Sequence, residues 1–321
     1  MSTKIQQPCG KNATRQPAFQ LIKWSLCIWG SLSLFICQGQ ESFPDLIKLD
    51  GYSQVYYVSP GNTKRVQEIA TRTDNATKYY KKLLGFQPKT VLFILAPKHW
   101  SLAAAKPLLN VYGFPHNVTS ERLVVASEDN SFWQSFTPPL ATLSPTLAAK
   151  VRKAYMKPDS SISMQPFFDL LAIHELGHPF HQQGGLKMQR HWMGEFFVNL
   201  MLHTYVAENE PHLLPALETW PEMAIAGGSK KYTYTSLEDF ERLYPSLGMG
   251  PVNYGWYQAH LHHAAKQVYE ASGSKTVVKL WKALKKHQED LGDAAFVEML
   301  QKEVDPNVAD VYRKWQMKIN L

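Results

Sequence analysis

The chain has 321 residues, with 34 Lys and Arg against 27 Asp and Glu and a formal net charge of +7. Residues 1–23 hold four of the basic residues and no acidic one, so the remainder has 30 basic and 27 acidic residues, a balance near +3 that excludes a strongly basic nucleic-acid-binding protein. The cysteines, Cys9, Cys27 and Cys37, all lie near the N-terminus, which excludes a disulfide scaffold or a catalytic cysteine from the rest of the chain.

The N-terminal segment has the pattern of an export signal. Residues 24–37 are fourteen apolar or small uncharged residues after a basic segment, a length that suits a signal peptide and is short for a bilayer span. Small residues at the −3 and −1 positions allow cleavage before Gln40. Two alternatives stay open: a lipoprotein attached at Cys37, or an uncleaved membrane anchor. Residues 1–39 are therefore expected to be a signal peptide or an anchor, and the protein to be exported to the periplasm or the extracellular space.

Strand and helix patterns alternate in the next part of the chain. Residues 54–58 and 90–95 have the apolar and aromatic composition of strands, and residues 63–84 have a helical pattern that Gly85 ends. Strand, helix and strand in this order predict a small mixed β-sheet with helices packed against it. Residues 40–165 are therefore expected to form a mixed α/β lobe.

A mainly helical region is expected to follow. Residues 101–120 and 131–165 are rich in proline and are predicted to be irregular and to line a cleft. From Phe167 onward the pattern is almost wholly helical, with breaks at glycine-containing turns. The predicted fold is α+β: a small mixed-sheet lobe, then a helical lobe over residues 166–321, with the functional site in the cleft between them.

The most informative motif is His174-Glu175-Leu176-Gly177-His178. Residues four apart lie on one face of a helix, so His174 and His178 can offer imidazole nitrogens to one metal ion. Glu175 then projects beside the metal, where its carboxylate can accept a proton from a bound water. This is the HExxH arrangement of zinc hydrolases.

A zinc site of this kind needs a third protein ligand, and two residues are candidates. His181 would share the face of His174 on a continuous helix, but Pro179 is expected to kink the chain there, so His181 is predicted to be a polar helix-end residue. Glu195 lies in a strongly apolar helical segment, 192–206, where an inward-facing carboxylate is costly unless a metal ion compensates its charge. Glu195 is the predicted third ligand, against the alternative of a solvated glutamate in a first helical turn.

A known family shares this pattern. HExxH followed by Glu195 in Trp192-Met193-Gly194-Glu195-Phe196-Phe197 resembles the gluzincin metallopeptidases, of the thermolysin and aminopeptidase-N type, with Gly194 in place of the more usual Asn. The resemblance extends over residues 90–270. It implies Zn²⁺ bound by His174, His178 and Glu195, with Glu175 as the general base.

Asn199 lies one helical turn after Glu195 and can orient a metal ligand by hydrogen bonding. Thermolysin-like enzymes carry an Asp at this place. The resemblance also implies a donor for the negative charge that develops on the carbonyl oxygen. Aminopeptidase-type members use a tyrosine on a later helix, and Tyr254 stands about there, with Tyr257 as the alternative. A histidine among His260, His262 and His263 could serve as one does in thermolysin-like enzymes.

The family also holds its substrate backbone along an edge strand that precedes the motif helix. Residues 122–127 have strand composition and are the expected edge strand, to which an extended peptide could pair. The run Asn130-x-Phe132-Trp133 is similar to the substrate-strand sequence of thermolysin-like enzymes.

Together these patterns predict an exported zinc-dependent metallohydrolase, first of all a peptidase that acts on peptide or protein substrates. Two alternatives stay open: a zinc hydrolase of a non-peptide amide or ester, and a catalytically silent binding protein that keeps a zincin-like fold. No nucleic-acid partner is expected, membrane attachment through the N-terminus stays open, and the sequence gives no oligomeric state.

Overall fold

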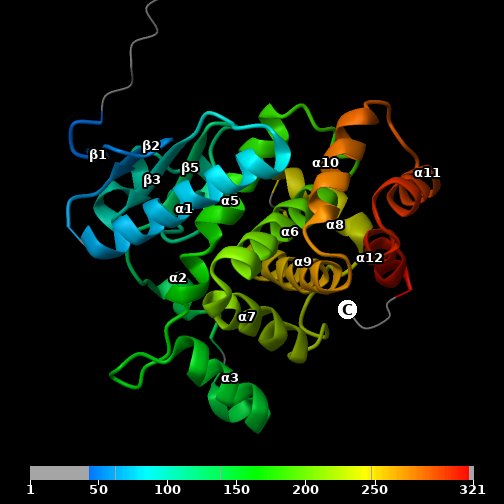
Figure 1. The fold of residues 1–321 in the computed structure, drawn as a ribbon. Helices are drawn as coiled ribbons and strands as arrows, with labels where there is room; N and C mark the ends of the chain where they lie inside the picture. Colours follow the sequence, from blue (N-terminus) through cyan, green and yellow to red (C-terminus); the bar gives the residue numbers. More distant parts are fainter. Residues whose placement is uncertain (1–42, 62, 138, 247, 318–321) are drawn as a thin grey trace, which may run out of the picture. The chain divides into compact units, whose positions relative to one another are not determined.

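Five strands form one mixed sheet near the N-terminal end of the described chain. The computed structural model describes residues 43–61, 63–137, 139–246 and 248–317. The strand order is β1-β2-β3-β5-β4, with parallel pairing in the centre and antiparallel pairing at both edges (Figure 1). The strands are β1 (Ile47–Leu49), β2 (Val55–Val58), β3 (Val91–Leu95), β4 (His116–Asn117) and β5 (Arg122–Ala126).

Helix α1 (Thr63–Leu84) connects β2 to β3 and joins the sheet region to the helices. Its buried face includes Val66, Ile69 and Tyr80, and the Tyr80 hydroxyl donates to the Met201 carbonyl at 2.8 Å. The helix ends at Gly85, whose φ of +69° is the left-handed conformation common after a helix. The predicted strands and the helix over 63–84 are confirmed to within one residue at each end.

The segment predicted to be irregular contains regular helices, and here the prediction is wrong in part. Helix α3 (Pro145–Tyr155) begins after Ser144, whose hydroxyl accepts from the Leu147 amide at 3.3 Å. Pro145 occupies the first helical position. Proline is favoured there because an N–H at that position has no hydrogen-bond partner within the helix. The other short elements are 3₁₀ turns and one-turn helices: η1 (Pro97–Leu102), η2 (Lys106–Leu108), α2 (Ser131–Gln134) and η3 (Leu140–Thr142).

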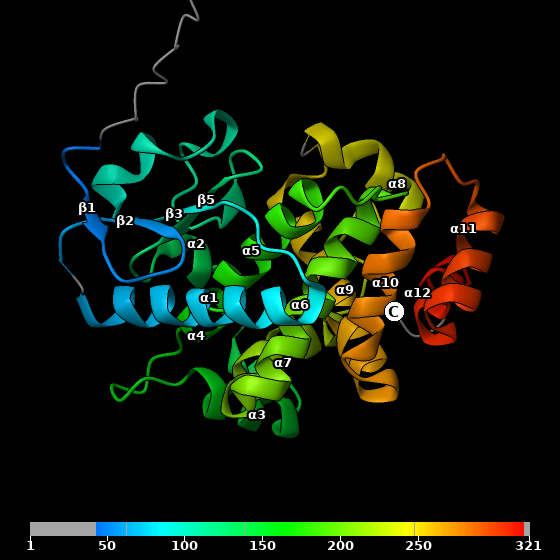
Figure 2. The same ribbon diagram turned by 45° about the horizontal axis from the view of Figure 1, so that its top comes forward.

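From residue 165 onward the described chain is almost wholly helical, as predicted (Figures 1 and 2). The fold is therefore α+β, with a mixed five-stranded sheet followed by a mainly helical region. The elements are α4 (Gln165–Phe168), α5 (Leu171–Gln183), α6 (His191–Asn209), η4 (Pro211–Leu213), α7 (Leu214–Ala226), α8 (Leu237–Leu243), η5 (Tyr244–Ser246), α9 (Gly250–Ser272), α10 (Lys275–Lys286), α11 (Asp293–Met299), η6 (Leu300–Val304) and α12 (Pro306–Gln316).

Helix α6 is the centre of the helical region. Every residue from Trp192 to Val206 is buried, because α5, α7, α8, α9 and α10 pack around it. A helix with apolar side chains on all faces is stable only in such a position. Polar residues on α6, above all Glu195 and Asn199, are therefore held away from water and must find partners inside the protein.

Helix α5 lies between the sheet and α6, and it continues through Pro179 to Gln183. The break that the sequence predicts at a glycine-containing turn is confirmed here. The helix ends at Gly184, and a left-handed Gly185 with φ of +73° follows. Proline inside an exposed helix lowers helix stability by about 3 kcal/mol, in part because one main-chain donor is missing. In α5 the packing against α6 outweighs this cost.

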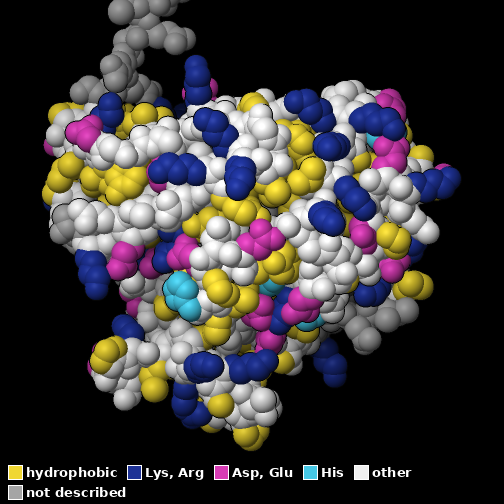
Figure 3. Space-filling view, viewed as in Figure 1, with side chains coloured by type: hydrophobic (Ala, Val, Ile, Leu, Met, Phe, Trp, Pro, Cys, Tyr) yellow, Lys and Arg dark blue, Asp and Glu magenta, His cyan; other side chains and the backbone are white. Residues whose placement is uncertain are grey.

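The surface mixes both signs of charge. On the face drawn in Figure 3, Lys and Arg side chains are interspersed with Asp and Glu. No helix among the described residues is long and apolar enough to cross a membrane. The predicted signal or anchor segment lies outside the described residues.

Candidate metal centre

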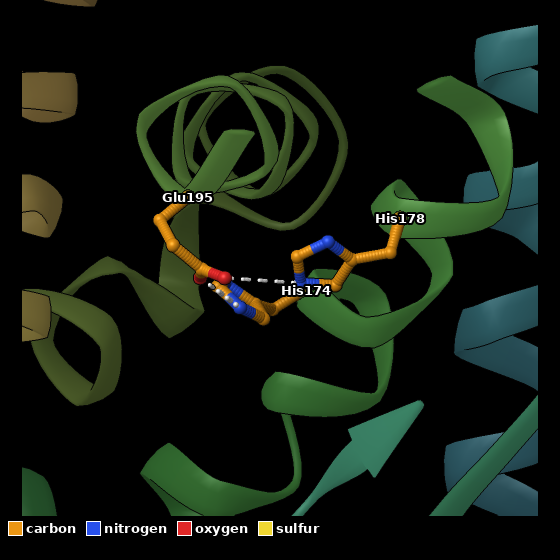
Figure 4. Close-up of side chains that lie close together, drawn as sticks. All are labelled: His174, His178 and Glu195. Carbon is orange, nitrogen blue, oxygen red and sulfur yellow. Dashed lines mark ion pairs between the residues drawn. The ribbon is translucent and has the colours of Figure 1, made fainter. Parts of the chain in front are cut away.

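Helices α5 and α6 bring together His174, His178 and Glu195 (Figure 4). His174 Nε2 lies 3.2 Å from Glu195 Oε2, and His178 Nε2 lies 3.7 Å from Glu195 Oε1. A tetrahedral zinc ion with bonds of about 2.1 Å separates its ligand atoms by about 3.4 Å, so the three side chains fit the geometry of one ion. They form a group that could bind a metal ion.

A glycine allows the two helices to approach closely. Gly177 lies between the two histidines in sequence, and a Cβ added there would be 2.8 Å from Val198 Cβ. No side chain fits at that distance, so only glycine allows this contact. Glycine inside a helix costs about 1 kcal/mol relative to alanine. In return, His174 and His178 on α5 come within reach of Glu195 on α6.

Hydrogen bonds on the far side of each ring orient both imidazoles. His174 Nδ1 lies 2.7 Å from Asn199 Oδ1, and His178 Nδ1 lies 3.1 Å from His181 Nε2. Both Nε2 atoms consequently face Glu195, as metal ligands held by outer hydrogen bonds do. His181 lies in the last turn of α5 and outside the triad, as predicted for a helix-end residue, and its ring is buried beside His178.

The carboxylate of Glu195 is the most thoroughly bonded group of the site. It is 1% exposed, and it accepts hydrogen bonds from the Tyr244 hydroxyl at 2.5 Å and from Gln258 Nε2 at 2.6 Å. Gln258 also accepts from Asn199 Nδ2 at 3.0 Å, which closes a chain of contacts from His174 to Glu195. Sequence reasoning missed Tyr244 and Gln258, because nothing local marks residues about 50 and 60 positions after Glu195 as its neighbours.

The charges of the triad compensate one another. Burial alone would raise the pKa of Glu195, but the His178 and His174 imidazoles and the Tyr244 hydrogen bond outweigh burial and hold this pKa below its usual range. Burial would lower the pKa of His174, but the hydrogen bond to Glu195 raises it. Burial lowers the pKa of His178 to about 4. A bound cation at this place would also compensate the charge of Glu195.

Glu175 stands beside the triad and outside it. Burial raises the pKa of its carboxyl to about 7, against a smaller opposing effect of His174. With the amide of Asn117 oriented to donate, Asn117 Nδ2 lies 2.5 Å from Glu175 Oε2 and 3.2 Å from the Glu175 main-chain carbonyl oxygen. That carbonyl would have bonded to the N–H of residue 179, which proline lacks. Asn117, which no local pattern in the sequence marks as a neighbour of Glu175, takes the place of that donor.

The structure separates the two tyrosine candidates. The Tyr254 hydroxyl accepts a hydrogen bond from Gln258 Nε2 at 2.6 Å, and the same nitrogen donates to Glu195. The Tyr257 hydroxyl donates to the Ser236 carbonyl at 2.7 Å, and Tyr257 is not among the residues that line the pocket beside the triad.

Among the three histidines of α9, one lies near the motif. The rings of His262 and His174 are 6.0 Å apart between centroids. His260 packs against Trp256 and Trp315, and His263 contacts Gln267 on the outer side of the helix.

The expected edge strand is placed differently from the prediction. β5 lies between β3 and β4, so Leu123 and Val124 are paired on both sides and the edge of the sheet is β4. The run that includes Phe132 and Trp133 starts α2 and is no strand: Asn130 Oδ1 accepts from the Trp133 amide at 3.0 Å. The helix cap at Asn130 therefore sets the local structure, although the residues that follow resemble a strand sequence.

An apolar pocket opens onto the triad. His174 and Glu175 form part of its wall, and Tyr254 and Gln258 form another part. The remaining wall is mostly aromatic: Phe114, Phe132, Phe136, Phe167, Phe168 and Trp220. Such a setting shields Glu175 from water and leaves a small apolar space beside it.

Comparison with known proteins returns no family model, no curated protein and no solved structure that matches this chain. The class is therefore defined by what the structure holds: an α+β protein with a buried His-His-Glu triad that could bind a metal ion. Two imidazoles and one carboxylate are the donor set of many catalytic zinc sites, so the residues fit that ion.

Proposed function

We propose that this protein is a zinc-dependent hydrolase of the gluzincin type and that it cleaves peptide bonds. The observation that carries the proposal is Glu175: a buried carboxylate beside the ligand triad and outside it, in the wall of an apolar pocket. A purely structural metal site has no need of such a group. A catalytic site needs a general base at that position.

Each residue then has a defined task. His174, His178 and Glu195 hold the ion, and three protein ligands leave a fourth position open. When bound, zinc would lower the pKa of its water and polarise the scissile carbonyl. Glu175 accepts the proton of the attacking water and passes it to the leaving amine.

The remaining polar groups of the site assist this chemistry. The Tyr254 hydroxyl donates to the carbonyl oxygen as negative charge develops there. Burial and the Glu195 charge raise the pKa of Tyr254 well above its ordinary value, so its proton stays in place. Asn199 and His181 hold the two imidazoles in the orientation that keeps both Nε2 atoms inward.

The test measures metal content and hydrolysis on the same purified protein. We expect one zinc ion per chain and cleavage of fluorescein-labelled casein that a chelator abolishes and added zinc restores. Glu175→Gln is expected to keep its zinc and to lose activity by about 1,000-fold or more, because only the base is removed. Hydrolysis by this variant at the wild-type rate would refute the assignment of the base.

We also propose that residues 1–39 direct export, either as a cleaved signal or as an anchor. The support is the uncharged stretch over 24–37 after a basic segment. N-terminal sequencing of the protein from its native cell tests this: a mature chain that begins near Gln40 supports a cleaved signal, and one that begins at Met1 in a soluble cytoplasmic fraction contradicts export.

A further inference from the structure

A second and larger cavity lies beside the apolar pocket of the metal centre. It is bounded by α2, η3 and the start of α3 on one side and by α7 and the start of α9 on the other. Helices α3 and α7 contact one another and lie side by side in Figure 1. The volume of this cleft is about 890 Å³, against about 70 Å³ for the pocket next to His174 and Glu175. The inner pocket admits little more than one side chain, and the cleft admits a far larger group.

The two spaces are continuous. Phe132, Phe136, Trp220, Pro251 and Gly255 line both of them. Gly255 lies where they join: a Cβ added there would be 3.1 Å from Phe136 Cε1 and 3.9 Å from Trp220 Cζ2. Glycine at this position allows the Phe136 ring to lie close against α9. A substrate held at Glu175 can therefore extend directly into the cleft.

The cleft wall carries polar groups beside its apolar surface. Ser135, Thr142 and Ser144 are exposed and belong to the lining residues. A polypeptide offers main-chain carbonyl oxygens and amide groups to such hydroxyls, and a hydrocarbon chain offers neither.

The rest of the wall matches an extended chain of mainly apolar residues. Leu143, Leu147 and Met223 provide apolar surface, and Lys231 is the one charged side chain among the lining residues that the structure describes. No acidic side chain of the described lining would repel or pair with the substrate. Apolar surface with a few placed polar groups is the usual composition of a site that binds an organic ligand.

We propose that this cleft is a subsite for an extended polypeptide segment of several residues on one side of the scissile bond. This rests on the proposed function, and it names the substrate class: unfolded or flexible polypeptides with apolar side chains near the cleaved bond, in place of dipeptides.

A peptide-length series tests the proposal. The probe is an internally quenched four-residue peptide, blocked at both ends, whose cleaved bond is located by mass spectrometry. Two further probes carry Ala-Leu-Ala added to its amino side or to its carboxyl side. We expect kcat/KM to rise about tenfold or more for one of the extensions and little for the other, because only one side of the bond enters the cleft.

Variants tie the length effect to the cleft. Ala224→Trp, in the wall of the cleft, is expected to abolish the ratio of long-peptide to short-peptide kcat/KM. Ala295→Trp is the matched control, since Ala295 is exposed on α11 and lines neither cavity. Circular dichroism and zinc content confirm that each variant is folded and loaded.

The outcomes separate this proposal from the proposed function. Chelator-sensitive cleavage of the short peptide with no gain from either extension would refute the cleft subsite and leave the peptidase intact. A larger gain from an N-acyl chain than from Ala-Leu-Ala would also refute it, in favour of a hydrocarbon occupant. A protein that binds no zinc and cleaves neither the short nor the long peptides would refute the proposed function itself.

Discussion

The side-chain amide of Asn117 reaches Glu175 at two points, its carboxylate Oε2 and its main-chain carbonyl oxygen. The second contact exists because Pro179, four residues later, has no N–H to offer that carbonyl. One residue on the edge strand β4 thus completes the helix and fixes the proposed base. Pro179 therefore contributes to the position of Glu175, because its missing N–H leaves the Glu175 carbonyl to the Asn117 amide.

Asn117→Ala is expected to lower kcat about 10- to 100-fold while zinc content stays at one per chain, since the base loses its orienting partner but the ligands are untouched. The measurement is steady-state hydrolysis of labelled casein with metal analysis of the same sample. A variant that loses its zinc would show instead that Asn117 supports the fold of the whole site.

A double-mutant cycle tests the role of Pro179. Pro179→Ala restores a main-chain N–H that can bond to the Glu175 carbonyl, so Asn117→Ala should cost about 1 kcal/mol less unfolding free energy in that background. Urea unfolding of the four proteins measures the coupling. Equal costs of Asn117→Ala in both backgrounds would show that the two residues do not share this carbonyl.

Gly177→Ala is expected to destabilise the protein by about 1–3 kcal/mol and to weaken zinc binding, because the new methyl meets Val198 Cβ at 2.8 Å and separates α5 from α6. Gly194→Ala is the matched control: it lies inside α6, and its nearest atom is Met188 Cγ at 3.8 Å. Alanine there is expected to be neutral or stabilising by about 0.5–1 kcal/mol. Thermal or urea unfolding distinguishes the two, and equal effects would contradict the close-approach role of Gly177.

Gln258→Ala is expected to weaken zinc affinity about 10- to 100-fold, because it removes the contacts that Gln258 makes with Glu195 and with Asn199. Competition with a chromophoric chelator gives the affinity. Tyr257→Phe is the control one residue away, since its hydroxyl bonds to the Ser236 carbonyl, and its zinc affinity should equal that of the wild type.

Buried histidines away from the metal ligands predict a loss of stability in mild acid. Burial lowers the pKa of His203 to about 4 and that of His260 to about 4, below the ordinary value of 6.5. As pH falls from about 6.5 to about 4, the unfolded chain takes up these protons and the folded chain does not, so the unfolding free energy decreases. Each residue should account for about 2 kcal/mol between pH 7 and pH 5.

Urea unfolding of the chelated protein at both pH values measures this effect. His260→Phe keeps a ring against Trp256 and is expected to reduce the difference between pH 7 and pH 5 by about 2 kcal/mol. An unchanged difference would show that His260 is protonated in the folded protein.

The sequence predicts those parts of the fold and site that depend on local patterns. Residues 63–84 form the predicted helix because their apolar spacing and the following glycine are local signals. The motif places His174 and His178 one turn apart on a helix, and Glu195 could be selected because a buried carboxylate needs compensation.

The remaining contacts depend on distant packing. Tyr244, Gln258 and Asn117 reach the site only after η5, α9 and β4 have docked against α5 and α6, and no spacing rule connects them. The sequence predicts the wrong edge strand, because the two-residue strand β4 is too short to produce a recognisable pattern.

The central claim is that His174, His178 and Glu195 form one zinc site, and the most direct test is the zinc stoichiometry of the purified wild type beside Glu195→Ala. We predict one tightly bound zinc ion per chain in the wild type and a loss of affinity of about 1,000-fold or more in the variant, since one of three protein ligands is removed. A folded wild-type protein that binds no zinc, or a Glu195→Ala variant that holds zinc as tightly as the wild type, would contradict the account.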